Sequence, residues 1–82
     1  MIKLREAVAK RLLELMEQKN LTLNGLARLS AVPPSTLKNI IYGKSNNPGV
    51  VTLKLLCDGM EISIIEFFNS PIFEELGYEE ID

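Results

Sequence analysis

Apolar and polar residues follow one another along this sequence with the period of amphipathic helices, and no stretch alternates as a half-buried strand does. The spacing predicts a first helix from Ile2 to Gln18, with a charged face opposite its apolar stripe. That stripe comprises Leu4, Val8, Leu12 and Leu15, widened by Ala9, Leu13 and Met16.

Capping residues predict two short helices after the first. The hydroxyl of Thr22 can accept an otherwise unpaired backbone N–H, so a second helix is expected over about 23–30. A third is expected over 34–42, because Pro34 suits a first helical position and Gly43 suits the position after the last.

Two more helices and a terminal turn complete the chain. A fourth helix is predicted over 50–59, and Ser63 with Glu66 forms a capping box that opens a fifth. A last short helix is expected over 70–76, and the acidic tail, 78–82, is expected to fray. The sequence therefore predicts a compact all-α domain of five helices with a short C-terminal extra turn.

The composition limits the class of protein. Apolar residues make up 46% of 82 residues, which is enough for one small core and one domain. The single Cys57 excludes an internal disulfide framework and suits a reducing compartment. Because the chain lacks a secretion signal and any apolar run near the roughly 20 residues of a membrane helix, it is expected in the cytoplasm, away from membranes.

The side-chain inventory argues against an enzyme. There is no histidine to act as a general base or metal ligand, and none of the five glycines lies in a phosphate-binding loop. Asp58 and Glu61 are near neighbours but are best explained as solvated carboxylates at a helix end. No catalytic residue, metal or cofactor is therefore expected.

Charge is divided unevenly along the chain. Residues 1–54 contain all nine basic residues and three acids, a net charge of +6, whereas residues 55–82 contain eight acids and no base. Such a chain can present a basic face to a polyanion although its overall charge is −2. Small domains also acquire uneven charge by chance, so this pattern alone does not assign a partner.

Residues 23–42 have the pattern of a helix-turn-helix unit, two short helices joined by a tight turn. The positions expected to lock the helices together are Leu26, Ala27, Val32, Leu37 and Ile40. The side chains left exposed on the second helix of the unit are those of Ser35, Thr36, Lys38, Asn39 and Tyr42.

On these residues the chain resembles the Cro/C1-type helix-turn-helix family, also called the XRE family, of bacterial and phage regulators. The matching segments are LNGLARLS (23–30), VPPSTLKNIIYGK (32–44), Pro48, Thr52 with Leu53, and ISIIEFF (62–68). The resemblance implies a lambda-repressor-like DNA-binding domain over 1–69, followed by a short acidic extension over 70–82. It also implies that the helix over 34–42 is a recognition helix that lies in the major groove of DNA.

The resemblance assigns roles to the exposed polar residues. Base-reading candidates are Ser35, Thr36, Lys38, Asn39 and Tyr42, and phosphate-binding candidates are Thr22, Arg28 and Lys44. Asparagine can bond an adenine edge through two hydrogen bonds, and lysine suits guanine or phosphate. Ordinary structural roles stay open as well, since serine and threonine favour a first helical turn, Lys38 and Asn39 suit plain solvation, and Tyr42 suits packing at a helix end.

Several positions depart from the family pattern. Ala31 replaces the usual glycine of the turn, Pro33 occupies a position where a capping serine or threonine is common, and Leu23 replaces a frequent glutamine. Asn46 and Asn47 stand where several relatives carry basic residues. These losses of polar and basic groups predict modest DNA affinity with a shallow dependence on salt.

Four large apolar residues near the end of the domain suggest an interface: Phe67, Phe68, Ile72 and Phe73. Some of them must close the core, and the others are expected to form an exposed patch. Relatives often dimerise through their last helices. A symmetric homodimer would place two recognition helices about 34 Å apart on a pseudo-palindromic operator in double-stranded DNA.

The sequence thus predicts a sequence-specific DNA-binding transcriptional regulator, specifically a repressor, that needs no cofactor. Two alternatives stay open. One is an antitoxin that also binds a toxin protein through its C-terminal patch. The other is a protein-interaction module that keeps the fold but has lost DNA binding, and Lys38 and Lys44 argue mildly against it.

Overall fold

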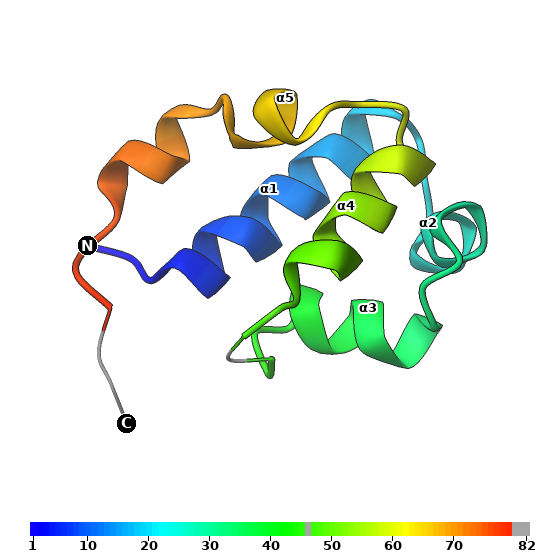
Figure 1. Ribbon diagram of the computed structural model, residues 1–82, viewed down its shortest axis with the longest axis horizontal. Coiled ribbons are helices and arrows are strands. Elements are labelled where there is room, and N and C mark those ends of the chain that lie inside the picture. The colour runs from blue at the N-terminus through cyan, green and yellow to red at the C-terminus, as the bar shows by residue number, and fades with distance from the viewer. Residues whose placement is uncertain (46, 80–82) are drawn as a thin grey trace.

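The computed structural model describes residues 1–45 and 47–79. Five α-helices follow one another along the chain: α1 Leu4–Gln18, α2 Leu23–Ser30, α3 Pro34–Ile41, α4 Val50–Gly59 and α5 Ile64–Phe68. A 3-10 helix, η1 Pro71–Glu75, follows them. The α2–α3 unit lies at one end of the molecule, and the first and last described segments of the chain meet at the other (Figure 1). The all-α fold class predicted from the sequence is confirmed.

Local capping signals mark the helix ends correctly. Thr22 Oγ1 accepts a hydrogen bond from the backbone N–H of Gly25 at 3.0 Å, and Ser63 Oγ accepts one from that of Glu66 at 2.9 Å. Gly43 has a φ of +71°, the left-handed conformation that glycine adopts without steric cost after a helix. The predicted bounds of α4 are also the observed ones.

One hydrophobic core joins the five α-helices. Its largest fully buried side chains are Leu12, Leu26, Leu37, Leu56, Cys57 and Phe67, which come from all five helices. Burial raises the pKa of the Cys57 thiol although Lys54 lies nearby. The thiol therefore stays protonated and packs as a small apolar group.

The tightest approach in the core joins the ends of α2 and α4. A Cβ atom at Gly59 would lie 2.9 Å from Ser30 Cβ and 3.0 Å from the Ser30 backbone nitrogen. The Ser30 side chain is itself buried, and its hydroxyl donates a hydrogen bond to Leu26 O at 2.7 Å. Glycine at position 59 therefore allows the two helices to touch backbone to backbone.

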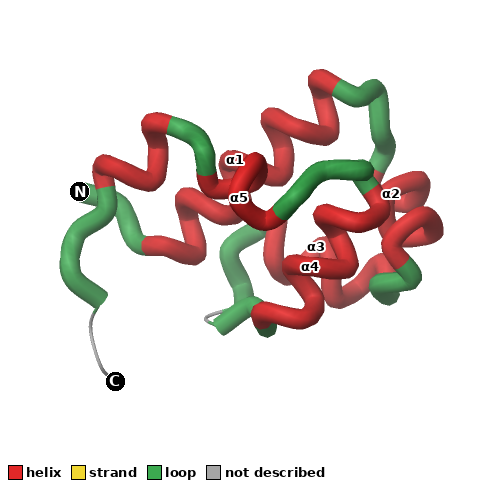
Figure 2. Tube along the Cα trace, turned by 45° about the horizontal axis from the view of Figure 1, so that its top comes forward, coloured by secondary structure: helices red, strands yellow, loops and turns green. Residues whose placement is uncertain are grey.

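The chain ends pair with each other, which the sequence pattern does not predict. The backbone N–H of Ile2 donates to Glu75 O at 3.3 Å, and that of Gly77 donates to Ile2 O at 3.1 Å. These bonds form a parallel bridge between Ile2 and Leu76, seen as the adjacent first and last described segments in Figures 1 and 2. Because Ile2 is bridged in this way, α1 begins at Leu4 and not at Ile2 as predicted.

Two further predictions are wrong. The apolar stripe of the first helix includes Leu4 and Leu13, but they are 39% and 47% exposed, so the buried face of α1 is narrower than the predicted stripe. The tail does not fray from residue 78 as expected. Instead the Glu79 carboxylate accepts a hydrogen bond from the Leu4 backbone N–H at 3.2 Å, while residues 80–82 lie outside the described part of the chain.

Candidate nucleic-acid interface

α2 and α3 are held together by their buried inner faces. The five residues predicted to lock the unit are at most 4% exposed: Leu26, Ala27, Val32, Leu37 and Ile40. Residues three and four positions apart share one face of a helix, so this burial leaves the opposite face of α3 to solvent. The predicted orientation of the unit is confirmed.

The turn between the helices is formed by Ala31 in the left-handed conformation, with φ 58° and ψ 30°. The backbone N–H of the next residue, Val32, donates to Ala27 O at 3.1 Å and closes the turn. A left-handed conformation costs an L-residue roughly 1–2 kcal/mol, which glycine avoids. Ala31 therefore carries backbone strain in this turn that a glycine would avoid.

The outer face of α3 presents polar side chains to solvent. Ser35, Lys38, Asn39 and Tyr42 are exposed, and Thr36 is half-buried. Within the part of the chain that the structure describes, none of these five side chains makes a hydrogen bond or an ion pair. The predicted exposure is confirmed for Ser35, Lys38, Asn39 and Tyr42 but only in part for Thr36, and the role of all five in reading bases stays a prediction.

The three predicted phosphate contacts also lie on the surface. Thr22 Oγ1 accepts the capping bond, which leaves the hydroxyl proton free to be donated to a phosphate. Lys44 lies in the α3–α4 loop, where its backbone N–H donates to Asn39 O at 2.9 Å. Arg28 borders a shallow groove at the α2–α3 turn. Neither cation forms an ion pair among the described residues, so both charges can meet a polyanion.

Some basic residues are already engaged inside the molecule. Arg11 Nε donates to Phe67 O at 2.7 Å, and Arg11 Nη2 donates to Glu66 O at 2.9 Å. The guanidinium group thereby bonds two backbone carbonyls at the C-terminal end of α5, where Glu66 O also accepts the capping N–H of Asn69. Lys54 pairs with Asp58 on α4. The excess positive charge of residues 1–54 therefore overstates what DNA can reach.

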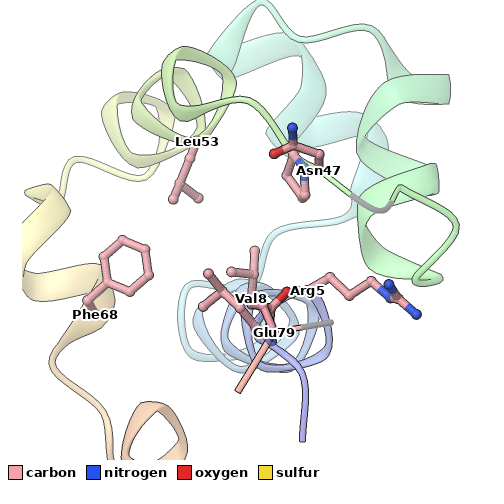
Figure 3. Close-up of a pocket in the computed structure, with 8 residues that line it drawn as sticks. Arg5, Val8, Asn47, Leu53, Phe68 and Glu79 are labelled. Atoms are coloured by element: carbon pink, nitrogen blue, oxygen red, sulfur yellow. Dashed lines mark hydrogen bonds between the residues drawn. The ribbon is translucent and has the colours of Figure 1, made fainter. Parts of the chain in front are cut away.

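Arg5 is a cation near the interface that sequence reasoning does not assign. It borders a cavity of about 150 Å³ together with Asn47 and Pro48 of the α3–α4 loop. Figure 3 shows its side chain extending away from the centre of this cavity. Arg5 lies far from the loop in sequence, so no local spacing marks this contact. Asn46, the other asparagine noted in this loop, lies outside the described residues.

The predicted dimer residues need one correction. Phe67 is fully buried, because it lies on the inner side of α5. The centroid of its ring lies 5.1 Å from the ring centroid of Phe68 and 6.0 Å from that of Phe73. Phe67 cannot meet a partner in this fold. Phe68 is 37% exposed, and Ile72 and Phe73 are half-buried.

A helix-turn-helix family model matches residues 12–67, more than half of the chain. The chain belongs to the helix-turn-helix family, of the Cro/C1 type. The crystal structure of prophage Lp1 protein 11 resembles this helix-turn-helix protein with a TM-score of 0.80 and 34% sequence identity, over 93% of this chain and 100% of that one. No curated protein matches the sequence.

Membership of this family defines the general activity. The helix-turn-helix family consists of DNA-binding regulatory domains and is not a family of enzymes, so this protein is a DNA-binding regulator in general terms. Among the described residues, no helix is both long and apolar enough to cross a membrane.

Proposed function

We propose that this helix-turn-helix protein is a sequence-specific transcriptional repressor that binds a pseudo-palindromic operator as a homodimer. One observation carries the proposal: α3 has a buried inner face, and its polar outer face has no partner within the described residues. Side chains in this state can bond base edges without breaking a bond inside the protein. Repression would follow from occupation of the operator in the cytoplasm, without a cofactor.

The base-reading surface is the outer face of α3. Asn39 lies four residues after Ser35 and three after Thr36, so the three side chains share one face of the helix. An asparagine there can bond adenine through two hydrogen bonds, and the threonine methyl can pack against thymine. Lys38, beside them, suits guanine or phosphate.

Backbone contacts flank this surface on both sides. Thr22, at the start of α2, and Lys44, after the end of α3, can each bond a phosphate oxygen, with Arg28 as a weaker third contact. Such contacts fix the register of a protein on the duplex but carry no sequence information. The family's roles for these residues are therefore compatible with their exposure.

We place the dimer interface on apolar residues exposed by α4 and α5. Val51 and Leu55 lie one turn apart on α4 and are 73% and 38% exposed, while Ile65 on α5 is 82% exposed. Phe68, on α5 and 37% exposed, would extend this surface, and its ring centroid lies 4.8 Å from that of Phe73. A second copy of the chain would cover these groups, as the apolar centre of a homodimer interface does.

Selection of bound duplexes from a random DNA pool at low salt tests the proposal. Enrichment of a palindrome with half-sites about one helical turn apart would support both the specific regulator and the dimer. A single half-site would support the regulator and contradict the dimer. Failure to bind any duplex would contradict the proposal and favour the protein-interaction alternative, and co-purification of a toxin would favour the antitoxin.

A pair of variants separates base reading from phosphate binding. Asn39→Ala should weaken the selected site by about 1–3 kcal/mol and relax preference at one or two base pairs. Lys44→Ala should weaken specific and random DNA alike and lower the salt slope by about 1. Fluorescence titration of each variant with the selected duplex and with a random-sequence duplex measures these changes in affinity. An unchanged sequence profile for Asn39→Ala would remove that residue from the base-reading surface.

A further inference from the structure

We infer that Glu79 is an affinity-determining residue of the DNA interface, an acid that the fold holds beside the α3–α4 loop, where it weakens the contact of this loop with DNA phosphates. The inference rests on the proposed function, because it concerns the same DNA-facing surface. It adds a repulsive group to an interface whose other assigned residues are attractive.

Glu79 is held in place by the pairing of the chain ends. The backbone bonds between Ile2 and residues 75–77 bring the C-terminal segment to the start of α1. There the Glu79 carboxylate accepts the Leu4 backbone N–H at 3.2 Å. The first N–H groups of a helix lack partners within it, and the partial positive charge at this end favours an anion. The carboxylate therefore has a defined position and does not hang from a free tail.

That position is next to the loop that follows the recognition helix. Glu79 borders the cavity of about 150 Å³ described above, together with Asn47 and Pro48 (Figure 3). The same loop begins with Lys44, the proposed phosphate contact, and is bonded back to α3 through Asn39 O. A phosphate that reaches Asn47 or Pro48 of this loop would therefore approach the cavity that the Glu79 carboxylate borders.

Two charges of opposite sign border the cavity from α1 and from the chain end. Arg5 is the cation, and no ion pair between Arg5 and Glu79 is present among the described residues. Charges separated by less than the Debye length, about 8 Å at physiological salt, are only partly screened. Asn47 brings no charge of its own to offset the carboxylate. Glu79 should therefore lower the affinity of the loop for phosphate, and lower it most at low salt.

The charge of Glu79 can be removed while its hydrogen bond is kept. In Glu79→Gln the amide oxygen can still accept the Leu4 N–H, so the chain-end pairing should persist. Glu74→Gln is the matched control, because it changes the net charge equally on exposed η1 and does not border the cavity. Both variants are titrated with one selected duplex at low and high salt, after thermal unfolding confirms that they fold.

We expect Glu79→Gln to bind about threefold tighter than the wild type at low salt, and Glu74→Gln to bind nearly as the wild type does. The difference should vanish at high salt, and Glu79→Lys should bind tighter still. Equal tightening by both glutamine variants would overturn the inference, since net charge would then explain it. If the wild type binds the duplex and Glu79→Gln binds it equally tightly, the inference is overturned and the proposed function stands. If the wild type binds no duplex, the proposed function is overturned together with the inference.

Discussion

The two ends of this molecule are stabilised by different kinds of interaction. At the helix-turn-helix end, apolar side chains from α2 and α3 are almost completely buried in the core. At the other end, Ile2 and Leu76 are joined chiefly by backbone hydrogen bonds, and η1 contributes no buried residue. The same kind of substitution should therefore cost far more at the first end than at the second.

Leucine truncation gives the largest expected difference between the two ends. Leu37→Ala removes a fully buried side chain from α3 and should cost about 2–5 kcal/mol of unfolding free energy, enough to unfold much of a small domain. Leu76→Ala removes a half-buried side chain and should cost about 1 kcal/mol. Urea unfolding followed by circular dichroism measures both. Equal losses would show that the chain ends belong to the core as firmly as α3 does.

Alanine in place of glycine gives the next difference. At Gly59 the new Cβ would meet the Ser30 backbone at 3.0 Å, so Gly59→Ala should cost about 1–2 kcal/mol even after the gain in helix propensity. At Gly77 it would meet only the exposed side chain of Met1, at 3.1 Å, which can move aside. Gly77→Ala should change the unfolding free energy by less than about 0.5 kcal/mol. A stable Gly59→Ala protein would mean that the α2–α4 crossing adjusts easily.

The last comparison predicts a gain in stability at the helix-turn-helix end. Ala31→Gly should stabilise the protein by about 0.5–1 kcal/mol, because relief of the left-handed strain exceeds the entropy that glycine adds to the unfolded chain. Ala9→Gly, the same substitution within α1, should destabilise by about 1 kcal/mol. Thermal unfolding of the two variants should therefore shift in opposite directions. A loss of stability in Ala31→Gly would show that alanine costs nothing in this turn.

Sequence reasoning succeeds where the determining contacts are local. A hydroxyl three residues before the N–H that it caps, as at Thr22 and Ser63, is visible in a short window of sequence, and both caps are present. The burial of Leu26 and Leu37 follows from helical spacing in the same way. The pairing of Ile2 with Leu76 joins residues 74 positions apart, so no short window contains it.

The candidate site is predictable to the same extent. Helical period places Ser35, Lys38 and Asn39 on the solvent side of α3, as the structure does. The net charge of residues 1–54 includes every cation in that segment. It cannot show that Arg11 is hydrogen-bonded to Phe67 of α5, because the two residues lie 56 positions apart. The burial of Phe67 is missed because a five-residue helix is too short for its inner face to be read from spacing.

The bridge between Ile2 and Leu76 also means that the helices could follow one another in a different order along the chain and keep the same arrangement in space. Ile2 and Leu76 lie side by side at the end away from the α2–α3 turn (Figure 2). A circularly permuted protein, with its old ends joined by a short linker and new ends opened between Lys19 and Asn20, would keep every helix and the outer face of α3 intact. A domain inserted at that linker would then lie at the opposite end of the molecule from the α2–α3 turn and leave the outer face of α3 uncovered.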